Sequence, residues 1–332
     1  MLLGAPEGGP SSWPVCLRQL GAAVHHTIEI AVPTGATETL LIELEALKGV
    51  LALSVVRGAS VKPAGDVVTV HVLNREVDAV LAVAERAQQF GPMSVSTGEL
   101  QSLIDPQATR AIDDDVDESP WEEFERGLRH HGRLNQNYLV LMVLGAAIAV
   151  AGLLSSPVPQ ALALAAAGII APAFEPVAKL TLGLVRGSWY AIRRALVAVA
   201  GGYVTLALVG ALAYLLLHRL GVGGPESLAA SEGVKTVIDP TAADWFISAG
   251  GATAGLVIIT AYRRAVLAGA LIALALVPAA VLIGVGVAAG QVDMALDALR
   301  RVGLDMFMVI VLGGTVVVLK QRFIHRNRHP LP

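Results

Sequence analysis

Cysteine, charge and nucleotide-binding motifs are all scarce in this chain of 332 residues. Cys16 is the only cysteine, so the sequence excludes an intrachain disulfide and a cysteine-based zinc site. Neither the GxxxxGK(S/T) nor the GxGxxG spacing follows a predicted strand, which argues against a phosphate-binding loop. The formal net charge of −3 provides no basic face for nucleic acid. We therefore expect no cofactor and no nucleic-acid partner.

Charged residues account for only 15% of the chain and hydrophobic residues for 55%, and the two kinds are unevenly distributed. Residues 1–134 have the composition of a soluble protein, whereas residues 138–320 consist mainly of long apolar runs. This contrast predicts one soluble and one membrane domain. Residues 1–26 lack the uninterrupted apolar core of a signal peptide and are punctuated by Pro and Gly, so we expect this N-terminus to be disordered.

Residues 27–104 alternate between strand and helix patterns. Ile28, Ile30 and Val32 occupy every second position, which is typical of a half-buried strand. A helix pattern, two strand patterns, a second helix pattern and a short strand at 93–97 follow. The order βαββαβ predicts a ferredoxin-like α+β domain, with an antiparallel sheet and two helices on one face. Because that fold hosts many activities, it does not define a function.

Two groups of residues in the soluble part are candidates for metal binding. His25, His26 and His71 have no cysteine or acidic residue beside them, which disfavours a metal site there. The acidic run at 113–118 lacks the glycine and the terminal glutamate of a calcium loop. Solvated side chains are the better interpretation of the acidic run, and we expect no metal site.

Residues 105–134 form a link between the two domains. The stretch 105–119 is acidic and almost free of large apolar residues, which predicts a flexible tether. From Ser119 onward, an N-cap and a first-turn proline begin a helix pattern with an apolar face and nearby arginines, which is typical of an interfacial helix leading into the membrane. The apolar face consists of Trp121, Phe124 and Leu128.

Residues 135–320 contain six apolar segments, at about 138–154, 158–186, 190–217, 245–262, 264–289 and 304–319. A helix needs about 20 residues to cross the hydrocarbon core of a bilayer. The second and fifth segments are too long for one straight crossing, and they carry Pro172 and Pro278 near their middles. Tilt or a helix break must absorb the excess length. The sequence therefore predicts a polytopic α-helical domain with six transmembrane helices.

The basic residues that flank these segments predict an orientation. With the N-terminus inside, twelve flanking Lys and Arg residues are cytoplasmic, including those of the basic tail at 321–332. Only Arg219, Lys235, Arg300 and Arg301 lie on the opposite side. The positive-inside rule therefore places both termini of a multi-pass protein in the cytoplasm, and we expect it in the plasma (cell inner) membrane.

A weak internal repeat relates the two halves of the apolar region. Pro172 precedes the pair Arg193-Arg194 by 21 residues, and Pro278 precedes Arg300-Arg301 by 22. Gly-Gly pairs follow at 201–202 and 313–314. Three helices per half invert the second half, so the pattern favours a 3+3 inverted repeat of the kind found in secondary transporters.

The strongest candidate site is the charged break in the second apolar segment. Two prolines four residues apart, Pro172 and Pro176, interrupt the helix pattern beside Glu175 and Lys179. Charged side chains at membrane depth normally face a protein interior or a water-filled cavity. Together with Pro278, these residues are the predicted solute or ion site, with half-helix ends near the bilayer midplane.

Three segments resemble the uncharacterised family of hydrophobic membrane proteins known as domain of unknown function 389 (DUF389). They are NQNYLVLMVLGAAIAVAGLL at 135–154, GIIAPAFEPVAKLTLGLVRG at 168–187 and GALIALALVPAAVLIGVGVA at 269–288. Members usually read GAMLIAPLMGPI in the second segment and IAVALVPPLAV in the third. Here Phe174-Glu175 replaces Met-Gly and Ala279 replaces the second proline, which indicates a divergent member. The resemblance implies a fold and a membrane location, not an activity.

Two functions remain open at this point. A transporter or channel for a small solute or ion, with a regulatory or ligand-sensing cytoplasmic domain, accounts for the intramembrane charge and the predicted broken helices. A non-transporting receptor or scaffold, in which the soluble domain binds a ligand and the helices anchor it, is the alternative. No catalytic pairing of acids, Ser/Lys or His occurs at membrane depth, which disfavours an enzyme. The expected partners are the lipid bilayer, a small solute or ion, and further copies of the chain.

Overall fold

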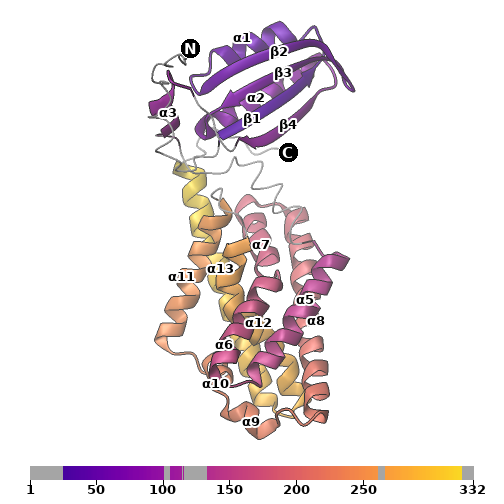
Figure 1. Ribbon diagram of the computed structural model, residues 1–332, viewed down its shortest axis with the longest axis vertical. Coiled ribbons are helices and arrows are strands. Elements are labelled where there is room, and N and C mark those ends of the chain that lie inside the picture. Colours follow the sequence, from indigo (N-terminus) through magenta and orange to yellow (C-terminus); the bar gives the residue numbers. More distant parts are fainter. Residues whose placement is uncertain (1–24, 101–104, 114, 116–132, 261–265, 324–332) are drawn as a thin grey trace, which may run out of the picture. The chain divides into compact units, whose positions relative to one another are not determined.

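The computed structural model of the chain describes residues 25–100, 105–113, 115, 133–260 and 266–323. They belong to two compact units, Met1–Pro120 and Trp121–Pro332 (Figure 1). Nearly all of the predicted disordered N-terminus, the apolar face of the predicted interfacial helix and most of the basic tail lie outside the described residues.

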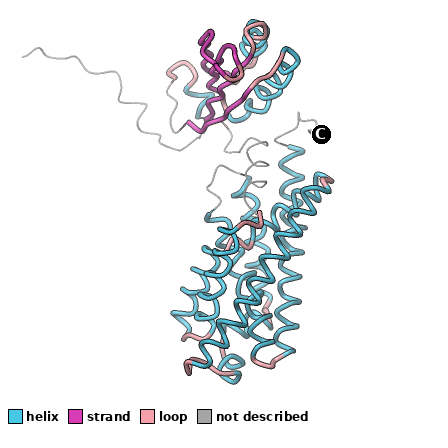
Figure 2. The backbone as a smooth tube through the Cα atoms, turned by 90° about the vertical axis from the view of Figure 1, so that its right-hand side faces the viewer, coloured by secondary structure: helices cyan, strands magenta, loops and turns pink. Residues whose placement is uncertain are grey.

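The N-terminal unit is a four-stranded antiparallel sheet with two main helices. The order β–α–β–β–α–β predicted from the sequence is confirmed, and the strands lie in the order β2-β3-β1-β4. Figure 2 shows the helices gathered on one side of the sheet. The elements are β1 (His25–Val32), α1 (Thr37–Glu45), β2 (Val50–Val61), β3 (Ala64–Val72), α2 (Val77–Ala87) and β4 (Ser94–Leu100), with the 3₁₀ turns η2 (Asn74–Glu76) and η3 (Gln88–Phe90) on either side of α2.

The core of this unit lies between the sheet and the two helices. Ile28 of β1 is opposite Val70 of β3 in the antiparallel ladder, and both side chains are fully buried. Ile30 and Val68 repeat this arrangement two residues further along. Every second residue of a strand points to the same face, so the alternation seen in the sequence directs these side chains into one apolar layer, which α1 and α2 cover.

The link after β4 contains structure that the sequence pattern does not predict. Residues Thr109–Asp113 form the short helix α3, and the side chain of Asp115 is fully buried within the N-terminal unit. The expectation of a solvated, flexible run is therefore wrong for Asp115. An acidic side chain is buried where several donors satisfy it, and composition alone does not reveal such donors.

The C-terminal unit is helical, and the described part of each predicted apolar segment corresponds to one helix, except the second segment, which is divided between two helices. Two short helices, α9 and α10, were not expected, and the last helix begins twelve residues before the predicted segment. The elements are α5 (Gln136–Leu153), α6 (Pro157–Ile170), α7 (Phe174–Arg186), α8 (Trp189–Arg219), α9 (Pro225–Ala230), α10 (Glu232–Ile238), α11 (Ala242–Thr260), α12 (Val266–Ala288) and α13 (Val292–Phe323).

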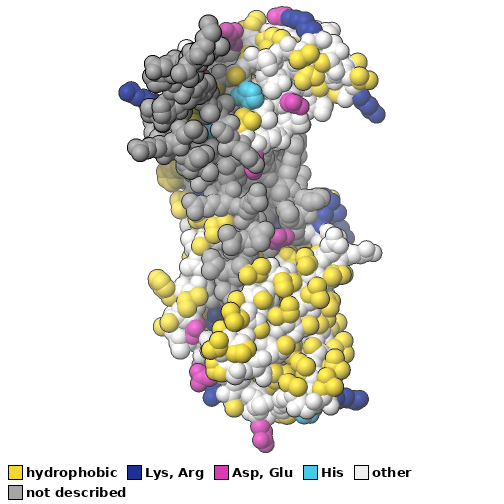
Figure 3. Space-filling model, viewed as in Figure 1, with side chains coloured by type: hydrophobic (Ala, Val, Ile, Leu, Met, Phe, Trp, Pro, Cys, Tyr) yellow, Lys and Arg dark blue, Asp and Glu magenta, His cyan; other side chains and the backbone are white. Residues whose placement is uncertain are grey.

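Several of these helices have the length and composition of membrane-crossing segments. Among the described residues, α5, α8, α11 and α13 are long and apolar enough to cross a bilayer, and the bent pair α6–α7 adds a fifth segment when it is counted as one span. The outer face of the helical unit carries many exposed apolar side chains (Figure 3), for example Leu208 and Leu212 of α8. An apolar exterior on a polytopic helical unit is what a lipid environment requires.

Helix α12 packs against α5, α6, α7, α8, α11 and α13. Its side chains from Leu276 to Leu282 are buried. It approaches α8 very closely, because a Cβ atom added at Gly284 would lie 1.7 Å from the carbonyl oxygen of Ala207. Small residues at a helix crossing permit such close backbone packing. The close crossing of α8 and α12 therefore requires a glycine at Gly284.

Candidate functional site

The predicted helix break at Pro172 is present in the structure. Helix α6 ends at Ile170, α7 begins at Phe174, and the two axes differ by 49°. Pro176 lies in the first turn of α7, where a missing backbone N–H is tolerated. Pro278, in contrast, lies inside the continuous helix α12. Of the two possibilities for the fifth apolar segment, tilt or a break, the structure thus excludes a break at Pro278, and the half-helix ends expected there are absent from α12. A membrane helix tolerates a single proline when its neighbours pack around it.

One tyrosine contacts the break directly, and a second joins α5 to α8. The hydroxyl of Tyr203, on α8, donates to the carbonyl oxygen of Ala173 at 3.3 Å. The hydroxyl of Tyr138, on α5, donates to the carbonyl oxygen of Ala198 at 3.1 Å. A Cβ atom at Gly202 would lie 2.0 Å from the Tyr138 hydroxyl, so glycine provides the space for this ring. Tyr203 thereby joins α8 to Ala173, the N-cap residue of α7.

The predicted charged residues lie in the first two turns of α7, directly after the break. Lys179 is buried, with 4% of its surface exposed, and Glu175 is half-buried. Each makes at least one further polar interaction, and Glu175 interacts electrostatically with Tyr138. The structure thus holds four of the predicted site residues on one segment, whereas Pro278 belongs to α12, which packs against both α6 and α7.

A buried ion pair on α13 was missed by the sequence analysis. Arg301 donates from Nε to Oδ2 of Asp305 at 2.8 Å, and the two side chains are 7% and 2% exposed. Arg301 lies outside the apolar segment predicted at 304–319, whereas the structure includes it in α13, which begins at Val292. The spacing of four residues, which places an arginine and an aspartate on one helix face, was the signal available in the sequence.

Helix α11 completes the surroundings of this pair. Arg301 donates from Nη2 to Oγ of Ser248 at 2.8 Å, and its guanidinium lies 4.6 Å from the centre of the Trp245 ring. Arg301 Nη1 and Asp305 Oδ1 are both buried without a hydrogen-bond partner among the described residues. Buried polar atoms are normally paired, so these two atoms are exceptions among the described residues.

Tyr203 connects the ion pair with the helix break. Its hydroxyl, which binds the Ala173 carbonyl, also interacts electrostatically with Tyr138 and Asp305. We call Tyr138, Glu175, Tyr203, Arg301 and Asp305 the buried polar cluster. It draws on α5, α7, α8 and α13, so residues far apart in the sequence meet inside an otherwise apolar unit.

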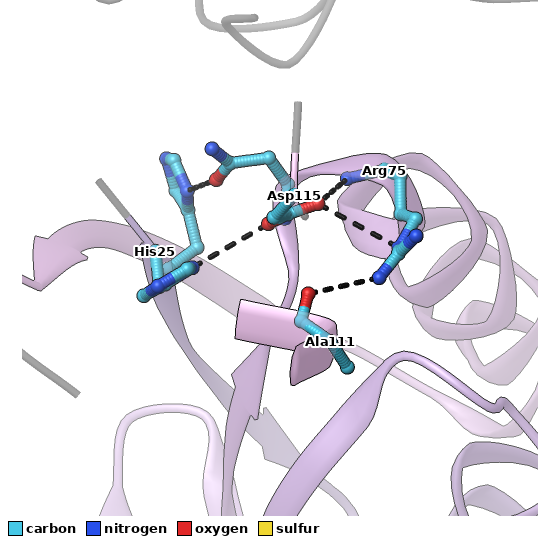
Figure 4. Close-up of polar contacts among 6 residues, drawn as sticks. His25, Arg75, Ala111 and Asp115 are labelled. Atoms are coloured by element: carbon cyan, nitrogen blue, oxygen red, sulfur yellow. Dashed lines mark hydrogen bonds and ion pairs between the residues drawn. The ribbon is translucent and has the colours of Figure 1, made fainter. Parts of the chain in front are cut away.

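A second polar cluster lies in the N-terminal unit (Figure 4). The carboxylate of Asp115 accepts from the backbone N–H of Asn74 at 2.6 Å, and the guanidinium of Arg75 lies on its other side, with Nε at 3.6 Å. His25 points its Nδ1 at the same carboxylate from 3.4 Å. Arg75 also donates from Nη2 to the carbonyl of Ala111 in α3, at 3.0 Å. These contacts hold the start of the link against η2.

The apolar helices, the break and the buried charges together define an integral membrane protein with a small N-terminal α+β unit. Residues 169–311 match the family model described as "Domain of unknown function (DUF389)". The helical unit therefore carries a DUF389 domain, which confirms the resemblance for the second and third of the three segments. No curated protein and no solved structure matches the chain.

Proposed function

We propose that the protein moves a small solute or an ion across a membrane, through a site built around the buried polar cluster. The observation that carries the proposal is the burial of Arg301 and Asp305 inside an apolar helical unit, next to a helix break. Charged residues at membrane depth cost about 2.5–3.5 kcal/mol each on insertion scales. A well-packed apolar pair generally holds such a unit together at least as well as a buried ion pair, so structural support alone does not account for these charges.

The break contributes to the same function. Half-helix ends leave backbone groups without helical partners, and transporters use such groups to bind solutes and ions. Here Glu175 and Lys179 follow the break, and Tyr203 links it to Asp305. We assign Pro172, Glu175, Pro176 and Lys179 to the walls of the site, with Pro278 facing them from α12.

The proposal extends to the architecture. We count α12 as a membrane crossing in addition to α5, the pair α6–α7, α8, α11 and α13, which gives six spans in a 3+3 inverted repeat. We also assign the N-terminal unit to the ferredoxin-like fold. The basic flanks place both termini in the cytoplasm of a plasma membrane protein. There the N-terminal unit is available to sense a ligand and regulate the helical unit. Assembly into a homo-oligomer is part of the same proposal.

A flux screen of purified protein in liposomes tests the function. The panel consists of K⁺, Na⁺, Cl⁻, acetate, phosphate and glycerol, with protein-free liposomes as the control. Faster entry of at least one probe supports transport. If every probe enters both preparations at the same rate, the transport proposal fails and the receptor alternative replaces it. A reporter fused before Met1 or after Pro332 tests the orientation separately, because activity outside the cytoplasm at either end contradicts it.

A further inference from the structure

The Asp115 carboxylate is held by donors from three sources. The backbone N–H groups of Asn74 and Arg75 lie 2.6 and 3.5 Å from its oxygens. The Arg75 guanidinium and the His25 imidazole approach at 3.6 and 3.4 Å. The carboxylate is fully buried, and these groups present hydrogen-bond donors or positive charge to it (Figure 4). Backbone amides combined with a guanidinium form the donor set that proteins use to bind carboxylates and phosphates.

The imidazole of His25 provides a second, independent observation on the same donor set. Its side chain is 2% exposed, and its buried Nδ1 faces the carboxylate but has no hydrogen-bond partner within the part of the chain that the structure describes. A buried ring nitrogen normally has a partner, and the present occupant supplies only a distant one. The neighbouring His26 is fixed differently, since its Nδ1 lies 3.1 Å from Oδ1 of Asn74. Asp115 thus leaves the buried Nδ1 of His25 without a hydrogen bond from the described residues.

The carboxylate that these donors hold, that of Asp115, belongs to the link and not to the sheet. Asp115 follows α3, and the described polar contacts of that segment with the rest of the unit run through Asp115 and through Ala111, whose carbonyl accepts from Arg75. A tethered group competes with a free ligand at an effective concentration of the order of millimolar for a short flexible linker. A free anion at higher concentration is therefore able to displace a tethered carboxylate that fits imperfectly.

We propose that this cluster is an anion-binding site whose built-in occupant is Asp115, and that a small free carboxylate or phosphate displaces it. The donors that release Asp115 then bind the free anion, while α3 keeps only the contact between Ala111 and Arg75 as its attachment to η2. The proposal deepens the sensing role proposed for the N-terminal unit, and only its regulatory meaning rests on that role. Anion binding is measured without any transport assay. A negative flux screen therefore does not contradict this site, and a negative anion test does not contradict transport.

Hydrogen exchange of the full-length protein in detergent provides the first test. Titration with sodium acetate or sodium phosphate is compared with sodium chloride at equal ionic strength. We expect acetate or phosphate to accelerate exchange over residues 109–113 about tenfold, as the loss of a charge-assisted contact implies. The amides of Asn74 and Arg75 remain protected because the free anion replaces the carboxylate. Equal effects of all three salts, or no effect of any, overturn the proposal.

Chemical rescue provides the second test. Asp115→Ala empties the pocket, so the amides of Asn74 and Arg75 exchange faster, and acetate or phosphate restores their protection while chloride does not. Asp113→Ala, in the same acidic run, is the matched control and retains wild-type exchange at both amides. If Asp115→Ala also removes the protection of β1 and β3, Asp115→Asn is tested instead. We expect a free anion to displace the side chain of the Asp115→Asn variant at a lower concentration than it displaces Asp115 in the wild type. The site is contradicted if no anion restores the protection of the Asn74 and Arg75 amides in Asp115→Ala. It is also contradicted if displacement in Asp115→Asn needs as much anion as in the wild type.

Discussion

Arg301 and Asp305 form a 2.8 Å ion pair across one turn of α13, and both side chains are buried among helices. One turn earlier, Arg300 and Asp297 form a 3.0 Å pair on the same helix, with 76% and 40% of their side chains exposed. The two pairs have similar chemistry and differ in burial. They therefore separate the role of a buried charge from that of a charge on the surface of the helix.

Removal of one member of the buried pair should destabilise the protein more than removal of both. Arg301→Met or Asp305→Asn leaves one buried group without its partner, which costs about 3–5 kcal/mol. The double variant removes both groups and should recover most of the loss. Asp297→Asn breaks the exposed pair and should change stability by about 1 kcal/mol or less. Thermal unfolding in detergent measures all four, and an additive double variant contradicts this account.

Glu175 and Lys179 should behave in a related way. They lie four residues apart on α7, and Lys179 is buried, so we expect them to neutralise each other in the empty site. Glu175→Gln and Lys179→Met should each lower the folded yield or the flux. The double variant should recover folding but not transport. Wild-type yield and flux in both single variants would show that the two side chains reach the interface as ordinary flanking residues.

Gly284 should tolerate no side chain. A Cβ atom there would lie 1.7 Å from the Ala207 carbonyl oxygen, so Gly284→Ala must push α8 and α12 apart. Overpacking of this kind costs about 1–3 kcal/mol. Gly303→Ala is the matched control, because a Cβ atom at Gly303 meets no atom within 4 Å and alanine favours a helix by about 0.5–1 kcal/mol. If Gly284→Ala unfolds at the same temperature as Gly303→Ala, the close crossing is not present.

Asp66 should make the N-terminal unit sensitive to acid. The amide of Gly58 and the hydroxyl of Thr37 donate to its carboxylate at 2.8 and 2.7 Å, and they lower the pKa of Asp66 from its ordinary value of 3.8. A lowered pKa in the folded state means that the stabilisation is complete above the unfolded pKa and is lost as pH falls through the folded pKa. The wild type should therefore lose stability below about pH 4.

The control for this prediction is Asp66→Asn, which removes the titrating group. It should be less stable than the wild type at pH 7, and the difference between the two should shrink as the pH falls below the range in which Asp66 titrates. Exchange rates of β2 and β3 amides in the full-length protein report the stability of this unit. A difference that stays constant from pH 7 to pH 3 argues against the role of Asp66.

Local patterns in the sequence predict much of this fold, because a strand or a membrane helix imposes its period on neighbouring residues. Alternation at Ile28 and Ile30 predicts β1, and Pro172 predicts the break between α6 and α7. The start of α13 was missed because residues 292–303 are amphipathic and not apolar. Arg301 and Asp305 neutralise each other within the helical unit; their spacing of four residues is visible in the sequence, but their burial depends on the packing of α11 against α13.

The second site depended still more on tertiary structure. Asp115 is one of several acids in a polar run, and nothing in the local sequence distinguishes it from Asp113 or Asp117. Its role follows from its proximity to Asn74 and Arg75, forty residues earlier in the chain. Contacts over such a separation are set by the whole unit, so composition and periodicity contain no signal for them.

The most direct test of the central claim is the transport rate of Asp305→Asn beside that of Asp297→Asn. Both variants remove one aspartate charge from α13, and only the first lies in the buried polar cluster. In liposomes with equal amounts of folded protein, at least one probe of the K⁺, Na⁺, Cl⁻, acetate, phosphate and glycerol panel should enter wild-type and Asp297→Asn vesicles at the same rate. Entry into Asp305→Asn vesicles should be about tenfold slower or more, given the cost of an unpaired buried charge. Equal rates for the two variants would contradict a transport site at Asp305.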